Sequence, residues 1–398
     1  MTWKESNRVD ERMKFITRLD GGERMTDLCL EFGISRKTGY KIWNRYQEIG
    51  AKGIFDQSRK PHYLARETRQ DIQELIVEVK REHQTWGATK IRDFLHRNHP
   101  GLKLPVRATV HAVLDKHGLV KPRRKRDRRV YPGASGLTEG IAPNLVWSAD
   151  YKGQFKMKNG QYCYPLTIAD HCTRFLLGCE ALENTQTSSA QRVFTEIFEQ
   201  YGLPECIRSD NGAPFASAGL LGLSRLAVWW MRLDINVEHT EPGHPQQNGR
   251  HERMHLTLKQ DVKIGANLLQ QQERLDDFQD TYNNFRSHES LGLKRPSELY
   301  KPSMRKLPRF LEPLEYPDHE YTKKVDGTGR IYFPKSNLRI FLSGVLAGEN
   351  IGLNKDDDNI WRVTFKNLDL GFVDLESGKF SSAQIAKQQT KVLPMSQD

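Results

Sequence analysis

Residues 241–259, EPGHPQQNGRHERMHLTLK, are the stretch around which the rest of the chain is organised. Two prolines and a glycine in its first five residues exclude a regular helix there, whereas the residues that follow are compatible with one. His255 and Lys259 follow Glu252 by three and seven positions, so the three side chains are predicted to share one helical face. An acid, an imidazole and an ammonium group on one face indicate a surface that handles phosphate rather than one that packs.

Two earlier acids stand where strands end or expose a polar residue. Residues 144–155 (NLVWSADYKGQF) alternate, which predicts a strand with Asp150 on its polar side. Residues 205–210 (ECIRSD) predict a short buried strand that ends at Asp210. Further strands are expected over residues 162–170, 175–182 and 236–240, and helices over residues 190–201 and 218–233. This order of strands and helices indicates an α/β domain with a mixed sheet.

Acids at strand ends have a specific use in phosphodiester chemistry. Two divalent ions ~3.5–4 Å apart activate an attacking oxygen and stabilise a leaving one, and Mg²⁺ prefers carboxylate oxygens. Asp150, Asp210 and Glu252 could converge on such a pair of ions. Asp170, beside His171 at the end of a strand, is the chief alternative first acid, and Glu241 is a weaker rival of Glu252.

Five motifs occur in this order: VWSADYKG, LTIADHCTRF, YGLPECIRSDNGAPF, PGHPQQNGRHERMHLTLK and YNNFRSHESLGLKRPSELY. Together they resemble the catalytic core of bacterial insertion-sequence transposases, which belong to the DDE superfamily that includes retroviral integrases and has a ribonuclease-H-like fold. The resemblance implies that Asp150, Asp210 and Glu252 are the catalytic residues and the ligands of two Mg²⁺ ions, with Mn²⁺ as an alternative. It also implies that Lys259 contacts DNA.

The implied activity is that of a DNA transposase, which cuts the ends of its element with water and then joins the freed 3′-hydroxyls to target DNA. Double-stranded DNA would be the partner of a homo-oligomer. A DNA-binding regulator with an inactive core, and a nuclease that cuts without joining, are the alternatives.

The sequence departs from the superfamily pattern in two places. Between Asp210 and Glu252 lie 41 residues, more than is usual, and the apolar stretch GLLGLSRLAVWWMRL is predicted to lengthen a helix there. Retroviral integrases also carry a zinc site before the core. This chain has only Cys29 before residue 163, so that zinc module is not expected.

Charge is distributed unevenly along the 398 residues. The formal net charge is +11; residues 1–140 hold 30 Lys and Arg against 18 Asp and Glu, and the other residues hold 31 against 32. This asymmetry favours a polyanion-binding region before the core. No run reaches the ~20 apolar residues of a membrane span, no secretory signal is evident, and five scattered cysteines suit a reducing compartment. A cytoplasmic, nucleoid-associated location in a bacterium is therefore expected, with no membrane partner.

The basic third is predicted to hold two helical DNA-binding units. Residues 1–60 read as a helix-turn-helix, with Arg36, Lys37, Lys41 and Arg45 on its second helix. Residues 61–120 look like a second helix-turn-helix or winged unit, in which Arg107 is a candidate DNA contact. Residues 121–140 form a basic linker, with the further DNA-binding candidates Arg123, Arg124, Lys125, Arg126, Arg128 and Arg129.

The core is predicted to span residues 141–301, with Arg286 and His288 near the surface and a short helix from Pro296. Residues 302–325 read as a proline-containing connector. Residues 326–380, with strands over residues 330–333, 338–342, 359–365 and 371–375, are expected to form a small β-barrel. Integrases carry an SH3-like barrel at this position. Residues 381–398 are a polar tail. The chain is thus expected to be multidomain, with all-α units, a mixed-sheet core and a barrel in that order.

Overall fold

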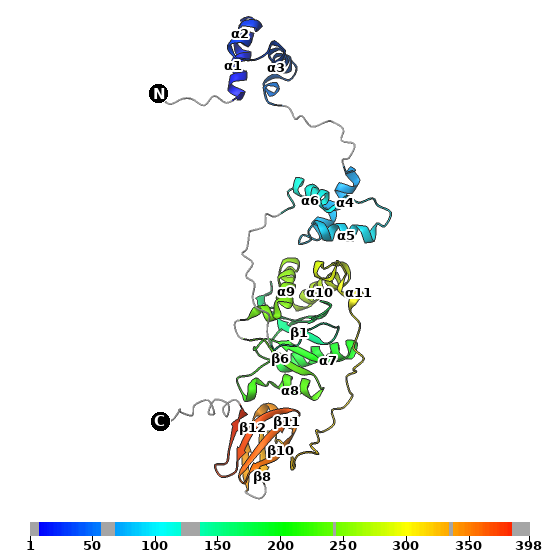
Figure 1. Ribbon diagram of the computed structural model, residues 1–398, viewed down its shortest axis with the longest axis vertical. Coiled ribbons are helices and arrows are strands. Elements are labelled where there is room, and N and C mark those ends of the chain that lie inside the picture. Colours follow the sequence, from blue (N-terminus) through cyan, green and yellow to red (C-terminus); the bar gives the residue numbers. More distant parts are fainter. Residues whose placement is uncertain (1–7, 57–67, 121–135, 242–243, 334–336, 384–398) are drawn as a thin grey trace, which may run out of the picture. The chain divides into compact units, whose positions relative to one another are not determined.

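The computed structural model of the chain describes residues 8–56, 68–120, 136–241, 244–333 and 337–383. The chain forms two compact units, residues 1–68 and 69–398 (Figure 1). The six cations predicted between residues 123 and 129, and most of the predicted polar tail, lie outside the described residues. No helix in the described ranges is long and apolar enough to cross a membrane.

The first unit is a bundle of three helices, α1 (Arg8–Asp20), α2 (Met25–Glu31) and α3 (Arg36–Ile49), followed by the 3₁₀ turn η1 (Gly50–Ile54). The turn between α2 and α3 follows the predicted chemistry. Gly33 has a φ of +64°, which glycine adopts without strain. The Ser35 hydroxyl accepts the Thr38 N–H at 3.2 Å and caps α3. Phe15, Ile16 and Leu28 form the core of the bundle, and the predicted helix-turn-helix is present.

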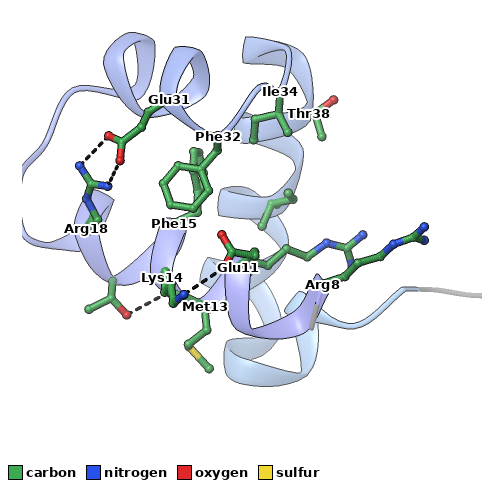
Figure 2. Close-up of a pocket in the computed structure, with 13 residues that line it drawn as sticks. Arg8, Glu11, Met13, Lys14, Phe15, Arg18, Glu31, Phe32, Ile34 and Thr38 are labelled. Carbon is green, nitrogen blue, oxygen red and sulfur yellow. Dashed lines mark hydrogen bonds and ion pairs between the residues drawn. The ribbon is translucent and has the colours of Figure 1, made fainter. Parts of the chain in front are cut away.

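A pocket of about 940 Å³ opens on this bundle (Figure 2). Phe15 and Phe32 lie in it, and the Arg18 guanidinium pairs with Glu31 at 2.6 Å beside it. None of the four cations predicted to contact DNA from α3 lines this pocket. The pocket is therefore separate from the predicted DNA-reading side chains.

A second helical bundle begins the other unit and consists of α4 (Gln70–Glu82), α5 (Ala88–Asn98) and α6 (Arg107–Lys116). Ile91 and Val110 are fully buried in its core, as their helical spacing predicts, and so is Trp86 from the loop between α4 and α5. Residues 68–120 contain no strand, so a wing, the alternative expected from the sequence, is not seen in that range.

The core domain is built on a mixed sheet with β1 (Val146–Tyr151) inside it. β1 pairs antiparallel with β3 (Tyr162–Asp170) on one side and parallel with β5 (Cys206–Ser209) on the other. β6 (Asn236–His239) extends the parallel side; β4 (Leu176–Leu182) and the short β2 (Phe155–Lys156) pair with β3. Residues 146–149 are buried because strands flank β1 on both edges and helices cover both faces. The mixed sheet is as predicted.

Different helices cover the two faces of this sheet. α7 (Thr187–Tyr201) and α8 (Arg225–Arg232) pack on one face through Phe194, Phe198 and Trp230. On the other face, α9 (Gly249–Asp261) and α10 (Leu268–Asp280) pack through Met254 and Leu275. The chain then forms a π-helical turn (Thr281–Phe285), a 3₁₀ turn η5 (Glu289–Leu291) and the predicted short helix α11 (Pro296–Leu299).

Two expectations for the core are wrong. Arg286, expected near the surface, is 7% exposed, and its guanidinium contacts the Thr85 hydroxyl at 3.2 Å and Asp261 at 3.5 Å. The apolar stretch after Asp210 does not lengthen a helix. It forms a 3₁₀ turn, η2 (Leu220–Gly222), and α8 then spans only eight residues.

A tertiary contact explains why that stretch is apolar. Ser224 caps α8 by accepting the Ala227 N–H at 3.1 Å, so the helix begins there. Leu220 and Leu223, before the cap, pack in one cluster with residues of the C-terminal strands such as Val363. The extra apolar residues thus dock the C-terminal domain on the core.

The C-terminal domain contains two sheets. One has the order β13-β12-β11-β10-β7 and the other pairs β8 with β9. The strands are β7 (Tyr321–Lys324), β8 (Arg330–Phe333), β9 (Leu338–Phe341), β10 (Asn350–Asp357), β11 (Ile360–Phe365), β12 (Leu368–Asp374) and β13 (Lys379–Ser382), with a 3₁₀ turn η6 (Gly344–Leu346). The sequence missed β7, β10 and β13, and β7 lies in the segment predicted as connector.

The predicted closed barrel is not found in the described residues. Closure requires that each edge strand find a partner, but β7 and β13 end the larger sheet without pairing to β8 or β9. The physical reason is that β8 and β9 pair with each other over four residues and leave both sheets with edges.

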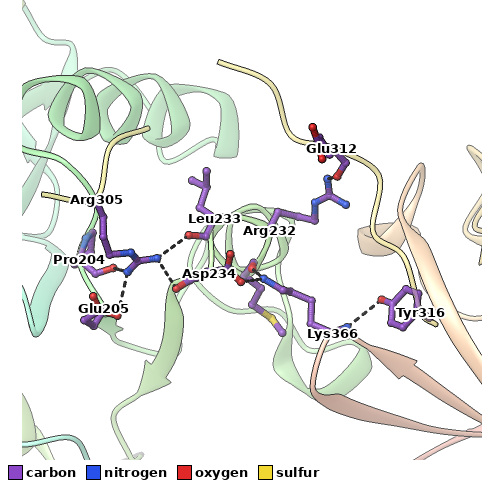
Figure 3. Close-up of polar contacts among 10 residues, drawn as sticks. Pro204, Glu205, Arg232, Leu233, Asp234, Arg305, Glu312, Tyr316 and Lys366 are labelled. Carbon is purple, nitrogen blue, oxygen red and sulfur yellow. Dashed lines mark hydrogen bonds and ion pairs between the residues drawn. The ribbon is translucent and has the colours of Figure 1, made fainter. Parts of the chain in front are cut away.

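Polar contacts also connect the end of α8 in the core with the connecting segment and the C-terminal domain (Figure 3). The Arg305 guanidinium donates to the carbonyl oxygens of Leu233 and Asp234 at 3.0 and 2.8 Å. The Lys366 ammonium, from the C-terminal domain, donates to the Met231 carbonyl at 2.7 Å and also contacts the Asp234 carboxylate. The end of α8 is therefore held by cations from two later segments.

Candidate active site

The strand register brings two of the predicted catalytic acids together. β1 and β5 are parallel and pair Ala149 with Ser209. The next residues along are Asp150, still within β1, and Asp210, directly after β5, and the negative charge of Asp210 acts on the Asp150 carboxyl group. The Asp210 carboxylate also accepts the Gly212 N–H at 3.1 Å, which turns the chain directly after the strand.

The Asp150 carboxyl group is electrostatically unusual. Burial, followed by repulsion from the negative charge of Asp210, raises the pKa of Asp150 to about 7; Glu252 adds a smaller repulsion, and the Tyr151 N–H opposes it. A cation bound beside this carboxyl group would stabilise its ionised form, because it would offset both the cost of burying the charge and the repulsion from Asp210. The donor set fits a hard divalent metal ion.

The third predicted acid comes from α9, which packs against β1. Glu252 lies in the first turn of α9 and is exposed, as is Lys259 in the last turn. All three positions lie on the one helix α9 at the i, i+3 and i+7 spacing that gives them a common side, as predicted. His255 is nevertheless only 7% exposed and contacts Thr167 of the sheet, whereas Glu252 and Lys259 are exposed.

Two histidines four residues apart on α9 form a polar layer beneath Asp150. His251 and His255 contact Ser148 and Thr167 of the sheet. Burial lowers the pKa of His251 to about 3 and that of His255 to about 2. Neither His251 nor Thr167 is predicted as a site residue from the sequence, in which the i, i+4 spacing of the two histidines is the signal for such a layer.

The two rival acids occupy different environments. Asp170 is 1% exposed and its carboxylate accepts N–H groups of Asn144 and Thr173 at 2.8 and 2.7 Å. Glu241 is exposed in the segment before α9, where it lies 3.6 Å from His244. Asp170 therefore stabilises the turn that follows β3, and Glu241 lies before α9 and not on it.

Lysines border a groove on the side of Lys152, whose positive charge acts on Asp150. A cavity of about 430 Å³ is bordered by Lys152, Lys259 and Lys263 around an apolar floor that includes Leu258 and Leu275. Lys152 is two residues from Asp150 in the sequence. Such a groove can hold a phosphate backbone beside the carboxylates.

The cations of the helical bundles that are predicted to bind DNA differ in solvent exposure and in their internal hydrogen bonds. Arg36, Lys37 and Lys41 are exposed on α3, and Arg107 is exposed at the first residue of α6. Arg45 is half-buried and donates to the Phe55 carbonyl at 3.3 Å. The first four are thus available to phosphates, whereas Arg45 also has an internal partner.

Two parts of the chain match known protein families. Residues 141–245 and 233–296 match two family models of the integrase core domain, and residues 11–62 match a helix-turn-helix domain. The central fold is therefore ribonuclease-H-like, with a helix-turn-helix domain before it.

Individual relatives come from insertion elements and retroviruses. The chain is 22% identical to the insertion element IS476 uncharacterized 39.2 kDa protein of Xanthomonas euvesicatoria, over 56% of this chain and 62% of that protein. It is 22% identical to the insertion element IS407 uncharacterized 31.7 kDa protein of Burkholderia multivorans, over 56% of this chain and 78% of that protein. The predicted resemblance to insertion-sequence transposases with an integrase-type core is confirmed.

Among the viral relatives, the chain is 32% identical to the Gag-Pol polyprotein of baboon endogenous virus, over 32% of this chain and 7% of the polyprotein. The match thus spans less than two thirds of this relative and of the IS476 protein.

Two solved structures are similar in part. The simian T-cell lymphotropic virus intasome in complex with PP2A regulatory subunit B56 gamma matches with a TM-score of 0.38 and 14% identity, over 80% of this chain and 100% of that one. The HTLV-2 integrase catalytic core domain in complex with magnesium matches with a TM-score of 0.30 and 15% identity, over 41% and 99%.

Proposed function

We propose that this protein is the transposase of an insertion sequence, which cuts DNA at the ends of its element and joins the resulting 3′-hydroxyls to target DNA. The observation that carries this proposal is the register of β1 and β5, which pairs Ala149 with Ser209, the residues directly before Asp150 and Asp210, inside a match to the integrase core domain. Glu252 acts electrostatically on Asp150 from α9 and completes the set of three acids.

The three carboxylates would hold two Mg²⁺ ions, with Mn²⁺ as a substitute. The fit rests on the raised pKa of Asp150, which burial and Asp210 cause and which a cation would reverse. When bound, the ions polarise the scissile phosphate and increase the acidity of the attacking oxygen. Asp150 lies in β1 and Asp210 directly follows the neighbouring strand β5, so the two acids would present their oxygens with little reorganisation.

Exposed cations would hold the DNA. Arg36, Lys37 and Lys41 on α3 would contact the element's end, as the second helix of a helix-turn-helix does in the major groove. Arg107 and the basic run at residues 123–129 would add phosphate contacts. Lys259, with Lys152 across the groove, would place the scissile strand beside the acids.

Joining two ends of an element in one reaction requires two active sites near each other. A homo-oligomer assembled on double-stranded DNA supplies them, with each copy contributing one set of acids.

The test uses linear duplex DNA that carries the sequences flanking the gene, together with a circular target and Mg²⁺. We expect the protein to nick the end and to produce joined molecules. Glu252→Gln and Asp210→Asn should lose both products, whereas Glu241→Gln, a matched change just before α9, should keep them. Nicked but unjoined DNA would indicate a nuclease, and binding without either product, in parent and variants alike, would indicate a regulator.

A further inference from the structure

A continuous row of polar side chains runs through the buried interior behind Asp150. The Ser148 hydroxyl lies 2.8 Å from Nδ1 of His251, and Nε2 of His251 lies 2.7 Å from the Thr167 hydroxyl. The same hydroxyl lies 2.7 Å from Nε2 of His255, whose Nδ1 is 3.6 Å from the Asp150 carboxylate. The row therefore joins strands β1 and β3 to helix α9 and ends on Asp150.

The donors and acceptors of this row can be assigned in one direction. Both rings are buried, at 1% and 7% exposure, and a neutral imidazole has one N–H and one lone pair. The Ser148 hydroxyl lies 3.3 Å from the Ala169 carbonyl oxygen, and the Thr167 hydroxyl lies 3.0 Å from that of Asp150. Both hydroxyls lie closer to a ring nitrogen, at 2.8 and 2.7 Å, so we assign each of them as a donor to a histidine ring.

With that assignment, Ser148 donates to Nδ1 of His251, and Nε2 of His251 donates to Thr167. Thr167 then donates to Nε2 of His255, which leaves the His255 proton on Nδ1, facing Asp150. The opposite direction would leave a lone pair on Nδ1 of His255, which finds a partner only when the Asp150 carboxyl is protonated. A metal ligand is ionised, so the first direction is the one that fits the proposed role of Asp150.

The row is not itself a metal site, although ligand atoms of Asp150, His251 and His255 lie within 4.8 Å of one another. Both nitrogens of His251 are engaged, one by Ser148 and one by Thr167. His255 uses Nε2 for Thr167, and its Nδ1 carries the proton. Neither ring therefore keeps a lone pair for a metal.

We propose that His255 is a positioning residue, which holds the Asp150 carboxylate in its metal-binding orientation through the contact of Nδ1, 3.6 Å from the carboxylate. Thr167, His251 and Ser148 set the tautomer of His255. The inference rests on the proposed function, in which Asp150 is a metal ligand. Groups that orient a ligand in this way typically contribute a factor of about 10–100 to metal affinity.

Two substitutions at one position separate the two nitrogens of His255. In His255→Asn the amide NH₂ takes the place of Nδ1 and still reaches Asp150. In His255→Gln the amide takes the place of Nε2 and reaches only Thr167. Both variants bury a neutral amide, so they are matched for polarity.

The measurement is the affinity of the full-length protein for Mn²⁺, by titration calorimetry, with thermal unfolding recorded for each variant. We expect His255→Gln to weaken Mn²⁺ binding by about 10–100-fold and His255→Asn to stay within about threefold of the parent. Thr167→Val, which keeps the shape of the side chain and removes the hydroxyl, should weaken binding by about threefold to tenfold, because the tautomer is no longer set.

Asp150→Asn is the reference variant. If it loses Mn²⁺ binding while His255→Asn and His255→Gln bind equally well, the inference fails and the proposed function stands. Unchanged Mn²⁺ binding by Asp150→Asn would overturn both. A directly bound ¹⁴N in the pulsed EPR spectrum of the Mn²⁺ protein, absent in His255→Gln, would make His255 a ligand and overturn the positioning role.

Discussion

Asp150 and Asp170 are aspartates on neighbouring antiparallel strands, and their surroundings are opposite. The register pairs Asp150 with Thr167 and Asp170 with Trp147, so the two carboxylates lie toward different ends of the strand pair. Burial raises the pKa of both. At Asp170, N–H and O–H donors of Thr173 and Asn144 oppose the effect of burial. At Asp150, the negative charge of Asp210 adds to it.

This difference separates a structural acid from a candidate ligand. The oxygens of Asp170 are occupied by the turn that they hold, so a cation would have to displace backbone donors. Asp150 faces other acids and has few donors, so a cation improves its environment. Placement at a strand end is common to both; the hydrogen-bond partners distinguish them.

The largest expected effect is that of Asp150→Asn on catalysis. Loss of a metal ligand should lower the rate of end cleavage about a thousandfold or more, because charge stabilisation worth several kcal/mol disappears. Thermal unfolding should change little or rise, since a repelled, buried charge is removed. A gel assay of nicked and joined DNA, beside a melting curve, checks both parts; a variant that cleaves within tenfold of the parent contradicts the assignment.

Glu238 extends the comparison, because its carboxylate is saturated like that of Asp170. It accepts the Thr138 N–H at 2.9 Å and pairs with Arg208 at 2.9 Å, where the guanidinium is 4% exposed. Glu238→Gln should lower the free energy of unfolding by about 3 kcal/mol at pH 7, because Arg208 loses its buried counter-charge. Urea denaturation measures this loss.

The same acid predicts a pH dependence of stability. Burial alone would raise the pKa of Glu238, but hydrogen bonds from Thr138 and Arg208 outweigh it, and the net pKa is lowered. Its stabilisation is therefore fully present above the ordinary pKa of a glutamate and is lost as the pH falls through the lowered value. Parent and Glu238→Gln should converge in stability on acidification; a gap that is constant from pH 7 to pH 3 would contradict this.

Asp170→Asn should destabilise the fold without a direct effect on chemistry. One amide NH₂ group would face an N–H donor of Asn144 or Thr173, at an expected loss of about 2 kcal/mol. Measured below its melting temperature, the variant should still cleave DNA within a few-fold of the parent. Complete loss of cleavage in a folded Asp170→Asn protein would move the catalytic role to Asp170.

Lys259→Ala should give the smallest effect, which is on DNA affinity, because it removes a predicted DNA-binding cation and not a carboxylate. An exposed lysine that contacts a phosphate contributes affinity without reading sequence, so binding should weaken evenly across DNA sequences and the salt slope should fall by about 1. Filter binding at several salt concentrations measures the slope. Lys263→Ala, from the same groove, is the matched comparison.

Local pattern predicted the elements that carry the candidate site. The alternation around Asp150, the buried run before Asp210 and the proline-containing loop before Glu252 each predict an element from a short window, and β1, β5 and α9 are found there. Ser35 and Gly33 likewise predict the helix-turn-helix, because caps and turns depend on neighbours only a few residues away. The catalytic roles themselves stay predictions.

Contacts between distant residues decided the rest. The register of β1 and β5 joins residues sixty positions apart, and the burial of His255 depends on where α9 lands on β1 and β3. The apolar stretch after Asp210 was assigned to a longer helix because periodicity records only that residues are apolar, not what they pack against. The number of sheets in the C-terminal domain was missed for a similar reason, since hydrogen-bond pairing between short strands is a property of the folded domain and not of any one strand.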